Sequence, residues 1–241
     1  MQSLVLAAGM STRLAALTGG APKPLTPVAG VPVLHRNLRW LAGHGIAQTY
    51  VNLHHRGEEV KRSIGDGSAF GVKVAWSEET QILSTAGAAK KLERELSADG
   101  KFLVVYGDNV FGFDLRRLID EHAAHQALAT IAVFDPQKNP NTGIAGGRVA
   151  SDASGRISGF IEGQPDAPGH VNAGVYVCEA GILKHLPALP SASDWAREIF
   201  PKLIAAGLEL RSHVIDGYCL GIDTPEAYRT AEKMFKDGIV R

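Results

Sequence analysis

The chain has 241 residues, of which 45% are hydrophobic and 21% are charged. This length is enough for one large α/β domain or two small ones, and the composition is that of an ordinary globular protein. The 25 basic and 25 acidic residues give a formal net charge of zero. We therefore expect no binding to nucleic acids or to anionic membranes, because no overall field attracts either partner.

The cysteine content indicates a reducing environment, and the apolar runs predict neither a membrane span nor a signal peptide. The two cysteines, Cys178 and Cys219, do not provide a disulfide framework, and the chain has no C-x-x-C motif. No stretch reaches the length needed to span a membrane, and the first apolar run is too short for a signal peptide. We therefore expect a cytoplasmic protein.

The N-terminal stretch predicts a phosphate-binding loop. The apolar run Leu4–Ala7 predicts a buried strand, and a loop of small residues, 8–12, follows it. Such a loop lets backbone N–H groups approach an anion closely. Arg13 and Lys23 can then neutralise charge on a triphosphate. The loop follows neither the Walker A pattern nor the dinucleotide-binding pattern.

Strands and helices alternate from there to residue 134. Apolar or alternating runs predict strands over 49–53, 72–76, 101–106 and 129–134. Helices are predicted from Pro32 to Gly43 or Gly45, over 58–64, from Ser84 or Thr85 to Leu96, and over 115–125 with Asp114 as cap. This alternation predicts a parallel, doubly wound sheet with the most apolar strand, 101–106, near its centre. Ligands bind such sheets at the carboxyl ends of the strands.

The pattern changes after residue 134. A loop rich in Pro, Asn and Gly spans 135–147, and short strands follow without long helices between them, at 148–150, 157–162 and 171–178. They predict a smaller, mostly antiparallel β portion. The remaining predicted elements are helices at 180–186 and 195–206, a strand at 209–214, and a helix beginning at Thr224 and Pro225.

The segment Ala7-Ala-Gly-Met-Ser-Thr-Arg-Leu14, followed by Pro22-Lys-Pro24, resembles the signature of the sugar-1-phosphate nucleotidylyltransferases. The family's usual form has glycines where this chain has Ala8 and Ser11. The resemblance implies an enzyme that joins a nucleoside triphosphate to a sugar 1-phosphate and releases pyrophosphate. It implies that the nucleotide contacts the strand end and the loop, at Leu6, Ala7, Ala8, Gly9, Met10, Ser11 and Thr12.

Cations are central to that chemistry, because one anion must approach another. Arg13 and Lys23 are the predicted catalytic residues, with Mg²⁺ bridging the phosphates. Asp108, directly after the most apolar strand, resembles the family's Gly-Asp metal ligand; alternatively it forms a turn or caps a helix.

The second predicted metal ligand is Asp223. Family members often carry Asp-Ile-Gly-Thr-Pro-Glu where this chain has Gly221-Ile-Asp223-Thr-Pro-Glu226, so Asp and Gly are exchanged. In an extended segment such a shift would move the carboxylate away from the site. Asp223 therefore either binds the metal or only supports the N-terminus of the following helix, and both interpretations stay open.

Further motifs imply the contacts with the base and the sugar. Leu83-Ser-Thr-Ala-Gly87 resembles the family's Leu-Gly-Thr-Ala-Gly segment, with an acid, Glu79, before it; a solvated glutamate is the alternative. The further nucleotide contacts implied are Glu79, Thr85, Ala86, Gly87 and Gly107.

For the sugar phosphate, 171–174 resembles the family's Asn-Ala-Gly, and an Asx turn at Asn172 is the alternative. Residues 160–163 resemble Phe-x-Glu-Lys-Pro, but Gly163 replaces the lysine, so Lys23 or Arg148 is expected to supply the phosphate contact. The implied sugar-phosphate contacts are Asn109, Gly143, Glu162, Asn172 and Gly174.

Two histidines invite a metal-site interpretation that we do not favour. His122 and His125 fall near each other on a predicted helix, but no third ligand of matching spacing is visible. We expect both at the surface.

The whole sequence predicts an α/β, Rossmann-like, doubly wound and mostly parallel sheet, with a smaller antiparallel portion for the acceptor. We expect one domain over 1–241, with a nucleotide-binding part at about 1–134 and a sugar-phosphate-binding part at about 135–241. The resemblance favours GTP with D-glycero-D-manno-heptose 1-phosphate or mannose 1-phosphate, with Mg²⁺ as cofactor and a possible homodimer. The alternatives are a uridylyltransferase for an amino-sugar 1-phosphate, a phosphocholine cytidylyltransferase, and a catalytically silent subunit that binds a nucleotide sugar.

Overall fold

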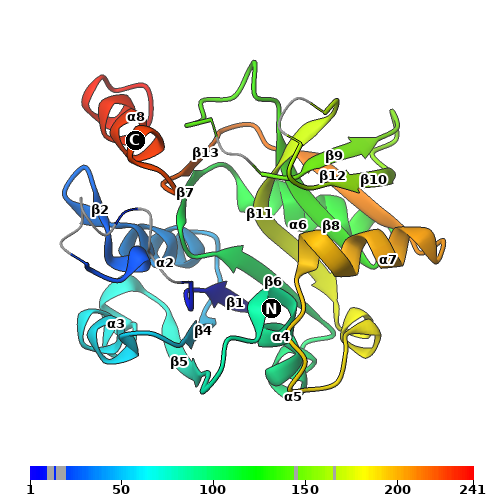
Figure 1. The fold of residues 1–241 in the computed structure, drawn as a ribbon, viewed down its shortest axis with the longest axis horizontal. Helices are drawn as coiled ribbons and strands as arrows, with labels where there is room; N and C mark the ends of the chain where they lie inside the picture. Colours follow the sequence, from blue (N-terminus) through cyan, green and yellow to red (C-terminus); the bar gives the residue numbers. More distant parts are fainter. Residues whose placement is uncertain (10–13, 15–19, 144–145, 165–166) are drawn as a thin grey trace.

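A computed structural model describes residues 1–9, 14, 20–143, 146–164 and 167–241 (Figure 1). The predicted nucleotide contacts Met10, Ser11 and Thr12 and the predicted catalytic residue Arg13 lie outside these described residues. No helix in the described part of the chain is both long and apolar enough to cross a bilayer.

The core of the molecule is a nine-stranded mixed sheet. Its main path runs in the order β10-β9-β11-β6-β1-β4-β5, while β8 pairs with both β11 and β12. The strands are β1 (Gln2–Leu6), β4 (Gln48–Leu53), β5 (Lys73–Glu78), β6 (Lys101–Tyr106), β8 (Ala129–Phe134), β9 (Arg148–Ser151), β10 (Ile157–Ile161), β11 (His170–Glu179) and β12 (Leu210–Val214). Because β5, β4, β1 and β6 are parallel neighbours, the predicted mostly parallel sheet is confirmed.

The long strand β11 runs antiparallel between β6 and β8. Val175 lies opposite Val105 of β6, and Tyr176 lies opposite Ile131 of β8. From Val171 to Cys178 every residue of β11 is buried, as expected for a strand that is covered on both faces. The antiparallel strands of the second half therefore extend the same sheet.

Helices cover both faces of this sheet (Figure 1). Successive residues of β6 alternate between the two cores, with Leu103 and Val105 in one and Phe102 and Val104 in the other. The first core contains α2 (Val33–Gly43), α3 (Gly57–Ile64) and α6 (Leu115–Ala124). The second contains α4 (Ser84–Lys91), α5 (Glu93–Leu96), η3 (Ala180–His185), the π-helical turn η4 (Trp195–Ile199) and α7 (Phe200–Ala205).

The predicted helix from residue 84 to Leu96 is two helices, α4 and α5, interrupted at Leu92. Neither Ser84 nor Thr85 caps α4, so that part of the prediction is wrong. The Thr85 hydroxyl instead donates to Asp194 and accepts from the backbone N–H of Trp195.

The other predicted caps are confirmed. The Asp114 carboxylate accepts from the N–H of Arg116 at the start of α6. The Thr224 hydroxyl accepts from the N–H of Ala227 at the start of α8 (Pro225–Lys236). Each satisfies a donor that the first helical turn leaves unpaired.

A small antiparallel sheet, which the sequence analysis did not predict, joins distant parts of the chain. It pairs β7 (Asn109–Gly112) with β13 (Tyr218–Gly221), and Asn109 lies opposite Gly221. Val110, Leu220 and, from α8, Ala231 share an apolar cluster with Val28 of β2 (Pro27–Val28). Strand β2 follows the short helix η1 (Lys23–Leu25) and pairs with β3 (Val31–Pro32) in a hairpin. A second short helix, η2 (Ser68–Phe70), precedes β5.

The expected surface position of His122 is wrong. Its side chain is 1% exposed, with Nδ1 2.9 Å from Thr130 Oγ1 and Nε2 3.0 Å from Glu179 Oε1. Helix α6 packs over β8 and β11 and carries this ring into the core, where two polar partners satisfy it. Burial lowers the pKa of His122, against the opposing effect of Glu179.

We predict that His122 makes the fold sensitive to acid. Because the pKa of His122 is lower in the folded chain, the unfolded chain binds the proton more readily. The free energy of unfolding should therefore fall as the pH drops from about 7 to 5. In His122→Gln this pH slope should be smaller than in wild type, although His35 and His213, whose pKa values burial also lowers, keep part of it. Urea denaturation at several pH values measures the slope, and the exposed His55→Gln is the control. Equal slopes for His122→Gln and wild type would contradict this assignment.

Candidate active site

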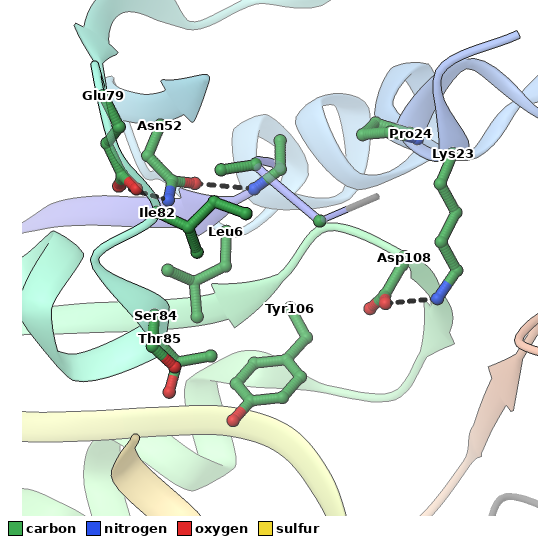
Figure 2. A pocket seen from close by; sticks show the side chains of 13 residues that line it. Leu6, Lys23, Pro24, Asn52, Glu79, Ile82, Ser84, Thr85, Tyr106 and Asp108 are labelled. Atoms are coloured by element: carbon green, nitrogen blue, oxygen red, sulfur yellow. Dashed lines mark hydrogen bonds and ion pairs between the residues drawn. The ribbon is translucent and has the colours of Figure 1, made fainter. Parts of the chain in front are cut away.

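A cavity of about 310 Å³ opens where β1, β4, β5 and β6 end (Figure 2). We call it the nucleotide cavity, after the predicted nucleotide contacts that line it. Six of the predicted nucleotide contacts line it: Leu6, Ala7, Ala8, Gly9, Glu79 and Thr85. The other lining residues are Lys23, Pro24, Asn52, Ile82, Ser84, Tyr106 and Asp108. Its place at the carboxyl ends of parallel strands is the expected one for this type of sheet.

Glu79 lies in a buried hydrogen-bond network at the wall of this cavity. Its Oε1 accepts from Asn52 Nδ2 at 2.8 Å, and its Oε2 accepts from the N–H of Leu83 at 3.0 Å. Asn52 Oδ1 in turn accepts from the N–H of Ala7 at 2.7 Å. Glu79 is 5% exposed, so a solvated surface glutamate is excluded. Asn52 is not among the predicted contacts; its one signal in the sequence is an amide side chain near the end of a buried strand.

Three predicted nucleotide contacts lie behind the wall of the cavity. The N–H groups of Ala86 and Gly87 both donate to the Ser193 carbonyl, at 2.8 and 3.2 Å. A Cβ atom at Gly107 would lie 2.7 Å from the Leu6 carbonyl oxygen, so glycine is needed for close packing on β1. These residues support the cavity, and their contacts with a nucleotide remain predictions.

A second cavity, of about 470 Å³, adjoins the first and shares Tyr106 and Asp108 with it. We call it the acceptor cavity. All five predicted sugar-phosphate contacts line it: Asn109, Gly143, Glu162, Asn172 and Gly174. Its lining also includes Gly146, Gly147, Asp194, Ala196, Arg197, Gly221, Asp223, Thr224 and Ala227.

The Asn172 side chain is used within the protein. Its Oδ1 accepts from the N–H of Gly174 at 3.0 Å, and its Nδ2 donates to Tyr176 Oη at 2.8 Å. The first bond has the local geometry that the turn interpretation expects. A direct contact between Asn172 and a sugar therefore remains a prediction.

Three charged side chains meet at the junction of the two cavities. Lys23 Nζ lies 2.6 Å from Asp108 Oδ2 and also forms an ion pair with Asp223 Oδ1. The Lys23 side chain is 11% exposed. Burial alone would lower the pKa of Lys23, but the two carboxylates outweigh it and the pKa is raised, so the ammonium stays charged.

The pairing of β7 with β13 explains why Asp223 reaches this junction despite the exchanged sequence. Asp108 immediately precedes β7, Asp223 follows β13, and Asn109 lies opposite Gly221. The two acids therefore extend from the same end of one small sheet. The cap of α8 is the Thr224 side chain, which leaves the Asp223 carboxylate directed to Lys23.

The nucleotidyl transferase family model matches residues 2–237. The chain belongs to this family. It is 33% identical over 233 residues to a mannose-1-phosphate guanylyltransferase of Mycobacterium tuberculosis, a match that covers 95% of this chain and 62% of that protein. It is 32% identical over 222 residues to a UTP–glucose-1-phosphate uridylyltransferase of Synechocystis, covering 86% of this chain and 56% of that protein. The chain thus spans only about three fifths of the length of these curated relatives.

The fold is also that of a solved structure. HddC from Yersinia pseudotuberculosis, complexed with GMP-PN, superposes with a TM-score of 0.79 at 22% identity. The match covers 97% of this chain and 99% of that one.

Arg197, which is not among the predicted site residues, provides a cation in the acceptor cavity. Arg197, from η4, lines that cavity with Glu162, whereas Arg148 lies on β9 and lines neither of the two cavities described. Burial raises the pKa of Glu162, against the opposing effect of the Arg197 guanidinium. Arg197 is therefore better placed than Arg148 to compensate for the lysine that Gly163 replaces.

Two carboxylates of the site are available to a cation. Among the described residues, no group of three or more His, Cys, Asp or Glu could hold a metal ion. Asp108 and Asp223 nevertheless converge on one positive charge, the Lys23 ammonium. Oxygen ligands suit Mg²⁺, which usually takes one or two carboxylates together with phosphate oxygens and water. The donor set therefore fits a magnesium ion that is held jointly with a bound triphosphate.

We predict that exchanging donor and acceptor in the Glu79 network is tolerated only as a pair. Asn52→Asp would set a carboxylate against the Glu79 carboxylate, and Glu79→Gln would set one amide donor against another. Each single change should destabilise the chain by about 1–3 kcal/mol and weaken nucleotide binding. In the double variant the new amide at position 79 can donate to the new carboxylate at position 52, so most of the lost stability should be recovered.

Thermal denaturation and calorimetric titration with a nucleoside triphosphate measure these effects. Losses in the double variant that equal the sum of the single losses would contradict the network.

Proposed function

We propose that this chain transfers a nucleotidyl group from a nucleoside triphosphate to a sugar 1-phosphate, with release of pyrophosphate. The observation that carries the proposal is the junction of two cavities at Asp108, with Lys23 and Asp223 beside it. A triphosphate in one cavity and a sugar phosphate in the other would meet at these charges. The curated relatives named above carry activities of this class.

In this reaction an oxygen of the sugar phosphate attacks the α-phosphorus, and the bond from the α-phosphorus to the bridging oxygen breaks. The nucleophile is already an anion, so no strong base is needed, and positioning and charge compensation supply the catalysis. On substrate binding, the Lys23 ammonium would move from its two carboxylates to the phosphates. Arg13, from the predicted phosphate-binding loop, is also proposed to contact the phosphates. A bound Mg²⁺ would supply charge stabilisation between the phosphates, held by Asp108 and Asp223.

We favour guanine as the base because of Glu79. Guanine presents two adjacent N–H donors, at N1 and at its 2-amino group, which match a carboxylate acceptor, whereas uracil presents one N–H between two carbonyl oxygens and cytosine one amino group beside two acceptors. Two oxygens of Glu79 accept one bond each within the protein, which leaves acceptor capacity on the cavity side. GTP with mannose 1-phosphate or D-glycero-D-manno-heptose 1-phosphate is therefore the preferred pair. Uridylyl transfer to an amino-sugar phosphate and cytidylyl transfer to phosphocholine are the alternatives.

Arg197 and Glu162 are proposed to bind the acceptor. The Arg197 guanidinium suits the phosphate, because its planar fork pairs well with anionic oxygens. Glu162 would accept from a sugar hydroxyl. The division into a nucleotide part and a sugar-phosphate part is supported by the lining of the nucleotide cavity, which comes from residues up to Asp108. The cytoplasmic location and the homodimer remain predictions.

A catalytically silent subunit that binds a nucleotide sugar is the candidate from another class. The assembled Lys23, Asp108 and Asp223 argue against it, because a subunit that performs no chemistry has no need of a buried cation between two acids.

The test is pyrophosphate release in a matrix of triphosphates against acceptor phosphates with Mg²⁺ present. We expect the highest kcat/KM for GTP with a manno-configured sugar 1-phosphate, and loss of that preference in Glu79→Gln. Asp108→Asn, which keeps the shape but removes the charge, serves as the inactive control. A chain that binds a nucleotide sugar but releases pyrophosphate in no combination would be the silent subunit.

The role of Asp223 is tested against its neighbour Thr224. Asp223→Ala should lower turnover by about 10²–10³-fold, the usual effect of removing one well-placed electrostatic group, and leave the melting temperature nearly unchanged. Thr224→Ala removes the cap and should cost about 1 kcal/mol of stability with little change in turnover. Melting temperature and turnover are measured on both variants. If Asp223→Ala melts early and turns over normally, Asp223 is no metal ligand.

A further inference from the structure

Asp194 lines the acceptor cavity and is bonded to a residue of the nucleotide cavity, and no motif of the sequence includes it. It lines the acceptor cavity. Its Oδ1 accepts from the N–H groups of Ala196 and Arg197, at 3.0 and 2.9 Å, and so fixes the first turn of η4. Its Oδ2 accepts from Thr85 Oγ1 at 2.9 Å, and Thr85 lines the nucleotide cavity. One carboxylate thus joins a wall of each cavity.

Thr85 makes a second hydrogen bond to the segment that contains Asp194. Its Oγ1 accepts from the N–H of Trp195 at 3.0 Å while its proton goes to Asp194. The N–H of Ser193 donates to the Leu83 carbonyl at 3.1 Å. A Cβ atom at Gly87 would lie 3.4 Å from the Ser191 carbonyl oxygen, so the two segments pack with little space between them.

Tyr106 connects this region to a further wall of the acceptor cavity. Its ring packs edge-on against the ring of Tyr176, with centroids 5.7 Å apart, and Tyr176 Oη accepts from Asn172 Nδ2 at 2.8 Å. Tyr106 lines both cavities and extends toward Thr85 in Figure 2. Burial raises the pKa of both tyrosines, so their hydroxyls stay protonated and can donate. Tyr106, which lines both cavities, is thus packed on a tyrosine that is bonded to Asn172 of the acceptor cavity.

We propose that Asp194 is a positioning residue that holds the nucleotide cavity and the acceptor cavity in register, through Thr85 on one side and through the backbone of Arg197 on the other. The proposal rests on the function proposed above, in which two anions must meet in line. Alignment of that kind is sensitive, since a misplacement of about 1 Å can reduce the rate about 10²-fold. Asp194 needs no contact with either substrate to have this effect.

We predict that a change in the wall of one cavity affects the substrate of the other cavity. Asp194→Ala, although it alters a residue of the acceptor cavity, should weaken binding of the triphosphate alone by about 10-fold. Thr85→Val, which alters the nucleotide cavity and leaves the cap of η4 in place, should raise KM for the sugar phosphate by a similar factor. Because both changes break the same contact, the double variant should be little worse than Asp194→Ala alone. Thr85→Ser keeps the hydroxyl and its bond to Asp194, so it should raise KM for the sugar phosphate much less than Thr85→Val does.

Asp152→Ala is the matched control. Asp152 also accepts from backbone N–H groups, those of Ser154 and Arg156, but in a surface turn that lines neither cavity. It should change neither triphosphate binding nor KM. Calorimetric titration with triphosphate, KM and kcat for each substrate, and melting temperature are measured on every variant.

The results distinguish this proposal from the proposed function. Crossed effects with non-additive losses support a positioning role for Asp194. Lower melting temperatures with unchanged triphosphate binding and unchanged KM values would overturn it, as would additive losses. If Asp194→Ala does not fold, Thr85→Val against Thr85→Ser decides alone, since only the former loses the contact. A wild-type chain that binds triphosphate but releases no pyrophosphate would overturn the proposed function, while the effect of Asp194→Ala on triphosphate binding could still be measured.

Discussion

The ion pairs of Lys23 with Asp108 and Asp223 are the interaction on which the candidate site depends. Two carboxylates at the end of one small sheet would repel each other, and a buried ammonium without partners would be costly. Together the three groups leave a net charge of minus one in a place where substrates of high negative charge are expected to meet. Such an arrangement allows the ion pairs to change partners. Phosphate oxygens can pair with the Lys23 ammonium, and the two carboxylates can then bind a divalent cation. The ion pairs that hold the site together without substrate are thus the ones that bound substrates would replace.

The sequence predicted the parts of the fold that local patterns encode. The apolar strand 101–106 is central, and the caps at Asp114 and Thr224 form as expected, because a cap depends on residues only a few positions away. The pairing of β7 with β13 had no such signal. Each strand has four residues, the partners are far apart in the chain, and strand preference depends on neighbours that the sequence does not reveal.

The same limit applies to the site. Gly9, Glu79 and Glu162 line the cavities as predicted. They could be predicted because each lies within a short motif that is recognisable from its neighbours in the sequence. Asn52 and Arg197 lie in no such motif. The structure identifies them as site residues because β4 pairs with β1 and η4 borders the acceptor cavity. His122 shows the converse error: a polar residue on an amphipathic helix was assigned to the surface, yet two polar partners on β8 and β11 allow it to be buried.

The antiparallel direction of β11 explains why the acceptor cavity adjoins the nucleotide cavity at all. In a parallel sheet only the carboxyl ends of strands reach the ligand-binding edge. Because β11 runs opposite to β6, with Val175 across from Val105, the beginning of β11 lies at the edge where β6 ends. Asn172 and Gly174 are therefore brought beside Tyr106 and Asp108, although they start their strand rather than end it. A parallel strand in that position would carry its beginning to the far edge of the sheet and leave the acceptor side of the junction without a wall.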